Sequence, residues 1–542
     1  MRVPYVIIPH MDSRLIRNFL FVLLVAGYVY YGLRYIEATS ITMDGAKYYV
    51  LFDDAMISMR YAYNLAHGLG PVWNAGERVE GFTNPLWVGY MAIFHLLPIP
   101  QARIGFYIQL SGLLFMAGTL YFVRKIVEEF TNDLPAMLAA VAFTAFYNPL
   151  NSWSLLGMEV SILTLLLTAS VYLVLRAAPA RFPLWTYILL AVSTLFRFDM
   201  AVPFIVILVV LFILQKEYRK QHLIWGLGLL VVFLGGQTIA RYVYYGDWLP
   251  NTYYLKVTGW PFVLRILRGL YALVWFSYYS NWVLFLLPFM ILLLRRDWKI
   301  NLLLFILLGQ MAYSVYVGGD AWENHGGANR YIALTMPVFF AAFVYGVEEF
   351  RQKVVAAFGT RKEAVIASRI AWLFVFVISI TNFNLLLGDW KYIERLTLAR
   401  KPDYVAASER NISLVLALQD TTKPGASIAV TGAGTVPYFL PDRYAVDILG
   451  KADPYIAHQT VRAPMSYADI PNMRPGHMKW DYAYTFGELK PDVIVNVWEG
   501  TSAEAAPYLE KYYVNAAIAP GVRVYLLKDT PNVFWDKVVI KN

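Results

Sequence analysis

The stretch FLFVLLVAGYVYYGLRYI, residues 19–36, is a long apolar run that follows two basic residues, Arg14 and Arg17. A helix of this length is about long enough to cross a hydrocarbon core of roughly 30 Å. A cleaved signal peptide is the alternative, but the run is long for one and no clear small-residue cleavage site follows it. We therefore predict that residues 19–36 form the first membrane span.

Further apolar runs follow along the chain, so the sequence predicts a mainly α fold, a polytopic membrane helix bundle of about eleven spans. The run from Pro85 to Pro98 is short and bracketed by proline, so we place it as a re-entrant or interfacial juxtamembrane helix and not as a span. The other runs lie near residues 104–123, 134–147, 160–176, 184–196, 201–215, 223–240, 270–294, 300–317, 331–349 and 366–387.

The composition is that of a membrane protein. Of the 542 residues, 58% are hydrophobic and 15% are charged, and the mean hydropathy is +0.48. A soluble chain carries about 25% charged residues. The sequence has no cysteine, which excludes disulfide scaffolds, zinc–thiolate domains and thiol enzymes. Its seven histidines show no HExxH pattern and no paired ligand spacing, so we expect no structural zinc site.

The net charge of +9 comes mainly from short basic clusters between apolar runs. This pattern indicates membrane topology and not nucleic-acid binding, because lysine and arginine concentrate on the cytoplasmic side. An odd number of spans places the clusters on one side, with the N-terminus inside and the C-terminus outside. The clusters are Arg124 and Lys125, Arg176 and Arg181, residues 216–220, residues 295–299 and residues 351–362.

The composition changes near Gly388. Residues 389–542 contain no further membrane-length run, and short β-rich runs there alternate with helical stretches. We therefore predict two domains, a membrane domain over residues 1–388 and an extracytoplasmic α/β domain over residues 389–542. The β-rich runs are 427–430, 493–497 and 522–527, and the helical stretches are 402–418 and 503–513. Gly432-Ala433-Gly434 lacks the third glycine of a dinucleotide-binding motif, so we interpret it as a turn.

The first outer loop, residues 37–84, holds the densest group of polar residues. Asp53 and Asp54 lie side by side in it, at the start of an amphipathic helix. They can cap the free N–H groups of that helix. They can also act in catalysis, because adjacent carboxylates raise each other's pKa, which suits a general base. Arg60 lies about two turns later and can partner a carboxylate or a phosphate.

The remaining outer loops add candidate substrate-binding residues. Trp73 and Trp87 can belong either to an aromatic belt at the membrane interface or to an ordered binding loop. Arg197 and Asp199 can form either a structural ion pair or part of a substrate-binding site. The candidates for substrate binding are Glu80, Asn84, Glu159, Arg197, Asn251, Lys256, Asp320, His325 and Arg330. The oxygens of Asp53 or Asp54 would also suit a divalent cation, although no metal or other cofactor is required by the pattern.

Several motifs together resemble the polytopic GT-C glycosyltransferases. The likeness is greatest to the bacterial group that contains the mycobacterial terminal arabinofuranosyltransferase AftB, and it covers most of the chain. The motifs are the pair Asp53-Asp54, NLAHG at 64–68, VEGFTNPLW at 79–87, GME at 157–159, DWLPNT at 247–252 and GGD at 318–320.

The resemblance implies a multi-pass enzyme of the bacterial cytoplasmic membrane. Such an enzyme transfers a sugar, here best taken as arabinofuranose, from a polyprenyl-phosphate carrier to a cell-envelope glycan or glycoprotein at the outer face. The family's reaction-centre acid falls on Asp53, with Asp54 beside it. We expect the leaving phosphate to be bound by Arg330, Arg197, Lys256 or Arg60, and the sugar hydroxyls by Asp320, Glu159 and Asn251.

A transporter or flippase of a lipid-linked sugar is the alternative. Transporters usually place ionisable residues near the membrane midplane and often have two related halves. The sequence shows neither feature, and its large polar loops on one side favour an enzyme that works at one membrane surface.

Overall fold

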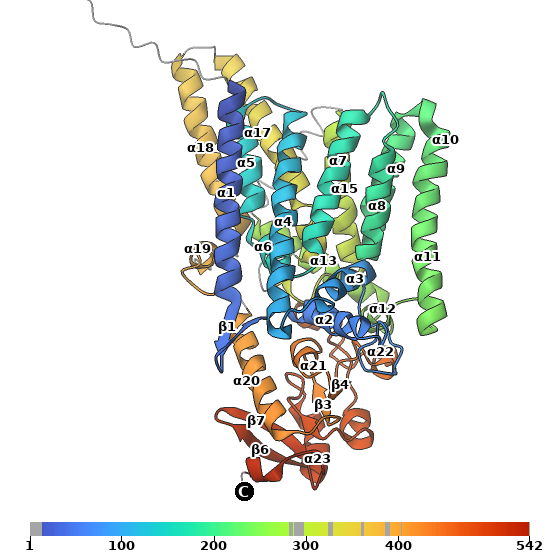
Figure 1. Cartoon of the computed structure of the whole chain (residues 1–542). Helices are drawn as coiled ribbons and strands as arrows, with labels where there is room; N and C mark the ends of the chain where they lie inside the picture. The colour runs from blue at the N-terminus through green and yellow to red at the C-terminus, as the bar shows by residue number, and fades with distance from the viewer. Residues whose placement is uncertain are drawn as a thin grey trace, which may run out of the picture.

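The computed structural model describes residues 13–280, 286, 297–323, 329–358, 362–384, 391–402 and 404–540. A helical bundle is joined end-on to a smaller domain that contains a mixed β-sheet (Figure 1). This arrangement confirms the predicted fold class, a mainly α polytopic bundle followed by an α/β domain. After the bundle, the described chain continues with α19 (Lys391–Leu396), which lies beside α1 in Figure 1, and with α20 (Val405–Thr421), which leads into the sheet-containing domain.

The apolar runs predicted from the sequence each overlap a helix, except that most of residues 281–296 lie outside the described residues. Six described helices are long and apolar enough to cross a membrane, and a bent pair adds a seventh if it counts as one span. The bundle helices are α1 (Ser13–Thr39), α4 (Gln101–Glu128), α5 (Leu134–Ala145), α6 (Asn148–Leu155), α7 (Val160–Ala177), α8 (Leu184–Phe196), α9 (Ala201–Leu214), α10 (Arg219–Gln221), α11 (Gly228–Tyr245), α13 (Phe262–Tyr279), α15 (Trp298–Tyr316), α17 (Met336–Phe358) and α18 (Lys362–Asn384).

The helices differ in length and in how much of their surface the protein covers. Helices α5, α8 and α9 have 12, 13 and 14 residues, and at about 1.5 Å per residue they are shorter than a bilayer core of roughly 30 Å. Of the apolar window in α7, 61% is buried, against 11% in α18 and in the helix that ends with α11. Helix α7 is therefore central, whereas α11 and α18 present apolar side chains outward.

Short elements lie between the bundle and the C-terminal domain (Figure 1). They are the hairpin β1 (Ser40–Met43) and β2 (Ala46–Tyr49), and the helices α2 (Asp53–Ala66), α3 (Pro85–His95), α12 (Asn251–Val257) and α16 (Arg330–Ala333). The segment predicted as a juxtamembrane helix forms α3. Helix α12 meets α13 at an angle of 89°, so α12 lies across the end of the bundle and outside its spans.

The sheet of the C-terminal domain has the strand order β4-β3-β5-β7-β6-β8. Strands β4 and β5 pair in parallel with β3, and the other pairs are antiparallel. The strands are β3 (Ser427–Val430), β4 (Tyr444–Asp447), β5 (Val493–Ile494), β6 (Tyr513–Ala519), β7 (Val522–Leu527) and β8 (Val539–Ile540). The helices α21 (Thr435–Phe439), α22 (Pro454–His458) and α23 (Ser502–Tyr512) flank them.

Buried hydrogen bonds attach the C-terminal domain to the bundle. Asn74 donates to the carbonyl of Ala445 over 2.9 Å and accepts from its N–H over 3.1 Å. The indole of Trp73 donates to the carbonyl of Ala433. Lys479 is buried and donates to the carbonyls of Tyr254 and Ala457, which lie on opposite sides of the boundary. These contacts fix the position of the domain over the end of the bundle.

The described residues of the predicted basic clusters lie at the other end of the bundle. Arg17 donates to the carbonyl of Asn132, and Lys299 contacts Glu129. Helix α10, which contains Arg219 and Lys220 of the cluster at 216–220, lies at the same end in Figure 1, far from the C-terminal domain. We call this end the basic end and the opposite one the domain end.

Candidate functional site

Helix α2 begins with two carboxylates that contact different parts of the protein. One oxygen of Asp53 accepts hydrogen bonds from the N–H and hydroxyl of Thr435, at 3.0 and 3.3 Å. Asp54 instead accepts from Arg330 over 2.9 Å and from Lys451 over 3.2 Å. Consecutive residues on a helix point about 100° apart, so Asp53 joins the C-terminal domain while Asp54 enters a charged cavity.

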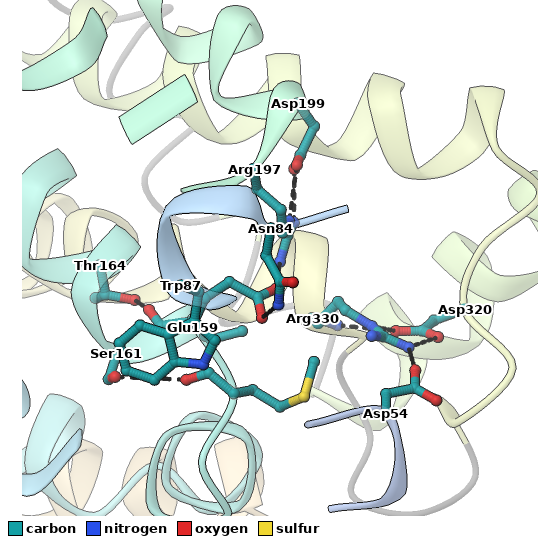
Figure 2. A network of polar contacts seen from close by, with 12 residues as sticks. Asp54, Asn84, Trp87, Glu159, Ser161, Thr164, Arg197, Asp199, Asp320 and Arg330 are labelled. Carbon is teal, nitrogen blue, oxygen red and sulfur yellow. Dashed lines mark hydrogen bonds and ion pairs between the residues drawn. The ribbon is translucent and has the colours of Figure 1, made fainter. Parts of the chain in front are cut away.

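Arg330 links Asp54 to a second carboxylate. Its guanidinium donates to both oxygens of Asp320, over 2.8 and 3.1 Å, and its third contact is Asp54 (Figure 2). It also lies over the ring of Trp153, 5.3 Å from the centroid. Bidentate, buried arginine–carboxylate pairs are geometrically specific. Arg330 is therefore held rigidly between the two acids.

The cations around Asp54 control its ionisation. Burial alone would raise the pKa of Asp54, but the charges of Lys451 and Arg330 outweigh burial and hold the pKa well below its usual range. Burial lowers the pKa of Lys451, but the carboxylates of Asp54 and Asp53 raise it above its usual value overall. Asp54 is thus ionised and its charge is neutralised by the groups that surround it.

Lys256 enters the same cavity from α12, and no hydrogen bond or ion pair engages its ammonium group within the described residues. Burial and the charge of Arg330 lower the pKa of Lys256 to about 8. Its methylene chain passes Gly476, where an added Cβ would lie 3.2 Å from its Cε. Because Gly476 also has a φ of +83°, glycine suits this position on two grounds. Lys256 is a cation available to a ligand.

A second polar network lies beside the first. Asn84 accepts from Ser58 and donates to Glu159, each over 3.0 Å. The guanidinium of Arg197 is 3.5 Å from Glu159 and makes a bidentate pair with Asp199 (Figure 2). All of these side chains are buried. The network therefore brings together three of the predicted site residues, namely Asn84, Glu159 and Arg197.

Two cavities meet at these networks. The charged cavity is lined by Asp54, Asp320 and Lys451, among others. The second cavity, of about 290 Å³, is lined mainly by apolar and aromatic groups together with Arg197 and Arg241. Both cavities are lined by Thr83, Glu159, Thr252, Lys256 and Arg330. The charged cavity measures about 60 Å³ in this structure, so it is a small polar pocket beside the larger and more apolar cavity.

Three predicted binding residues have other contacts in the structure. Arg60 is buried on α2 and donates to the carbonyls of Trp73, Pro437, Leu440 and Arg443, so it joins α2 to the C-terminal domain and does not line the charged cavity. Asn251 donates to the carbonyls of Gly450 and Lys451. Glu80 pairs with Arg241. The remaining candidate, His325, lies outside the described residues.

The sequence did not predict the residues that the C-terminal domain contributes to the cavity. Lys451 follows β4, and Gly476 and His477 lie in a long connection before β5. They come from a domain whose first residue is more than three hundred positions after Asp54, and no local motif marks them.

The groups around Asp54 do not fit a divalent cation. Asp54 and Asp320 are both paired with Arg330, and Lys451 contacts Asp54 as well. The oxygens of Asp54 thus face positive charges, which would repel a cation. Across the described residues, no group of three or more histidine, aspartate or glutamate side chains is placed to hold a metal ion.

The fold is similar to those of two solved proteins, ArnT and the oligosaccharyltransferase AglB. The crystal structure of ArnT from Cupriavidus metallidurans in the apo state superposes with a TM-score of 0.56 at 13% identity, and the match covers 95% of this chain and 98% of that one. The structure of the same protein bound to undecaprenyl phosphate gives a TM-score of 0.53 at 12% identity, with 94% and 98% covered.

An archaeal protein has the same architecture. The oligosaccharyltransferase AglB from Archaeoglobus fulgidus, in complex with an inhibitory peptide and a dolichol-phosphate, gives a TM-score of 0.52 at 11% identity, and the match covers 97% of this chain and 76% of that one. A family model described as a domain of unknown function (DUF8728) matches residues 403–530, which form most of the C-terminal domain. A search of curated proteins finds no match.

Proposed function

We propose that this protein is a membrane glycosyltransferase that transfers a sugar from a polyprenyl-phosphate carrier to a glycan or glycoprotein acceptor. The observation that carries the proposal is the position of Lys256, an uncommitted cation where an apolar cavity meets the cavity of Asp54. A polyprenyl-phosphate sugar has an apolar tail, a central phosphate and a polar sugar in that order. The structure offers matching environments in the same order: the apolar cavity, then the ammonium group of Lys256, then the charged cavity.

The solved structures support the same carrier chemistry. ArnT was crystallised with undecaprenyl phosphate, and AglB was solved with a dolichol-phosphate. Both ligands are polyprenyl phosphates. We therefore place the phosphate at Lys256 and the lipid chain along the cavity that Arg197 and Tyr313 line. The sugar would lie beside Asp54 and Glu159, where the charged cavity, about 60 Å³ in this structure, has to widen to receive it.

The proposed reaction is a displacement at the anomeric carbon. The oxygen of an acceptor hydroxyl forms the new bond to that carbon, and the bond from the carbon to the phosphate oxygen breaks. The polyprenyl phosphate leaves with the bonding electron pair, stabilised by Lys256. The proton of the hydroxyl passes to Asp54. The donor phosphate competes with Asp54 for Arg330 and Lys451, which frees a carboxylate oxygen to accept that proton.

The geometry favours Asp54 over Asp53 for this step, because Asp54 lines the charged cavity and Asp53 is bonded to Thr435. The sequence resemblance supports arabinofuranose as the sugar and the bacterial cytoplasmic membrane as the location. It also supports an outward-facing domain end, with the basic end in the cytoplasm. The positive-inside rule supports the same orientation.

Paired asparagine substitutions test the assignment. We expect Asp54→Asn to lower transfer from polyprenyl-phosphate sugars, including the arabinofuranose donor, by about 100-fold or more, because the amide cannot take the proton. Asp53→Asn is a matched control of the same size at the next position. Its amide oxygen can still accept from Thr435, so we expect activity within about threefold of the wild type.

Wild-type turnover in Asp54→Asn would contradict the proposed role of that residue. Proteoliposomes separate the enzyme from the alternative function. Movement of the labelled lipid-linked sugar across the bilayer, without formation of a new glycosidic bond, would identify a flippase and overturn the proposed function.

A further inference from the structure

A third cavity lies between the C-terminal domain and the domain end of the bundle. It has a volume of about 480 Å³, within the range of ligand sites. Arg268 of α13 and Glu323 line it on the bundle side. The C-terminal domain contributes two tryptophans, Trp480 and Trp498, and the acidic residue Glu504. We call this cavity the aromatic cleft. None of the steps above uses it.

The aromatic cleft adjoins the charged cavity. Ala321 and His477 line both of them. The ring of His477 stacks on Trp498, with centroids 5.3 Å apart and planes at 24°, and it meets Trp322 edge-on at 5.4 Å. His477 is buried, and burial lowers the pKa of its imidazole to about 3, so a neutral ring stands at this junction.

The charges that line the aromatic cleft balance, because three arginines (Arg268, Arg462 and Arg474) face three glutamates (Glu323, Glu499 and Glu504). Arg268 contacts Glu323 over 2.8 Å, and Arg474 contacts Glu499 over 3.2 Å. Arg462 contacts Asp481 over 3.1 Å. The cleft therefore offers donors and acceptors without a net positive field, unlike the cavity that holds Lys256. This balance suits an uncharged ligand with many hydroxyl groups better than a phosphate.

The tryptophans indicate the shape of that ligand. Trp480 donates its indole N–H to Glu504 over 2.9 Å, which fixes the ring. Trp498 is only partly buried, so part of its surface is available. Large flat rings beside paired charges present an apolar face and hydrogen-bonding groups together. A sugar ring has the matching surfaces, with C–H groups on its faces and hydroxyls around its edge.

We propose that the aromatic cleft binds the acceptor as an uncharged oligosaccharide, whose reacting end passes His477 to reach Asp54. This proposal rests on the proposed glycosyltransferase function and adds the class of the acceptor. It separates the two substrates in space. The lipid-linked donor enters from the apolar cavity at Lys256, and the acceptor enters from the opposite side, between the C-terminal domain and α13.

Calorimetric titration of the full chain in lipid nanodiscs tests the proposal. The probes are a linear arabinofuranose hexasaccharide and mannohexaose, which are uncharged, and a galacturonate hexamer, which is acidic. We expect at least one uncharged probe to bind about tenfold or more tightly than the acidic probe. We expect Trp498→Ala to weaken that binding by about tenfold, and Trp498→Phe to restore most of it.

Phe534→Ala is the control, because Phe534 is an exposed aromatic residue of the same domain that does not line the cleft. It should bind the probe as the wild type does. Arg474→Ala provides a second test at an exposed ion pair, where loss of the side chain should not affect folding. Equal binding by wild type, Trp498→Ala and Arg474→Ala would overturn the proposal, and so would tighter binding of the acidic probe.

The outcome is separable from that of the proposed function. If Asp54→Asn loses transfer but Trp498→Ala changes neither saccharide binding nor the acceptor KM, the cleft assignment fails and the enzyme assignment stands. If the wild type binds an uncharged saccharide through Trp498 but transfers no sugar from any donor, the enzyme assignment fails and the saccharide site stands.

Discussion

At the scale of single residues, the ionisation of Lys256 determines how the protein responds to pH. Its pKa of about 8 means that the side chain is charged below that pH and neutral above it. If the ammonium binds the donor phosphate, kcat/KM for the donor should fall as the pH rises through about 8. Lys256→Arg should move this fall upward by at least about one pH unit, because arginine keeps its charge.

A second lysine supplies the control for this pH profile. Burial also lowers the pKa of Lys479 to about 8, but Lys479 donates to backbone carbonyls and lines neither cavity. Lys479→Arg should therefore leave the fall in kcat/KM near pH 8 unchanged. A shift caused by Lys479→Arg and absent in Lys256→Arg would show that the phosphate is bound elsewhere.

The sequence identified the carboxylates at this scale but not their separate partners. Two adjacent acids at the start of a helix predicted that Asp53 and Asp54 are functional candidates. The same pattern could not show which of the two has which role. The difference between them comes from Thr435, Arg330 and Lys451, which are hundreds of residues away in the chain. Arg60 is a similar case, because its spacing fits a phosphate ligand, whereas three of its four carbonyl partners belong to the C-terminal domain.

At the scale of elements, the contact between α2 and the loop before α21 depends on a small residue. A Cβ at Gly434 would lie 2.1 Å from the backbone oxygen of Asp53, which requires the backbone to shift. We expect Gly434→Ala to destabilise the protein by about 1–3 kcal/mol and to reduce activity, because α2 positions Asp54. Thermal unfolding in detergent and a transfer assay measure the two effects.

Gly432 provides a matched control in the same loop. A Cβ there would lie 3.4 Å from a side-chain oxygen of Asp53, an ordinary contact, and neither glycine has a left-handed backbone conformation. Gly432→Ala should therefore change stability by less than about 0.5 kcal/mol. Equal unfolding temperatures for the two alanine variants would show that α2 and this loop are not in close steric contact at Gly434.

The regular elements could be predicted well where the local pattern was strong. Strands β3 and β7 have the bounds predicted from β-rich runs, and the turn at Gly432-Ala433-Gly434 is the loop that approaches Asp53. The bend between α12 and α13 was not predicted. Arg265 and Arg268 interrupt the apolar pattern at the start of α13, so the sequence placed the beginning of this helix later than residue 262.

At the scale of the whole molecule, the absence of cysteine makes the membrane orientation directly testable. Tyr467 is 70% exposed on the C-terminal domain, and Lys220 is exposed at the basic end. Each Tyr467→Cys or Lys220→Cys variant contains a single thiol. A membrane-impermeant maleimide should label Tyr467→Cys in intact spheroplasts and Lys220→Cys only after permeabilisation. The reverse pattern would place the basic end outside.

The succession of apolar helices and the sheet-containing C-terminal domain could be predicted because hydropathy and composition are local properties. The contribution of both domains to one site could not be predicted, because it depends on tertiary contacts such as those of Asn74 with Ala445 and of Lys451 with Asp54. Charge pairing within the aromatic cleft was likewise invisible in the sequence, because its partners come from different loops.

The contact of Lys451 with Asp54 has a consequence for protein engineering. A chimera that exchanges the C-terminal domain for one from a relative would also exchange a charge next to Asp54. It would remove the carbonyls that hold Arg60 as well. The two domains are therefore not interchangeable modules, and acceptor preference is better altered by point changes along the inner surface of the domain than by grafting a whole one.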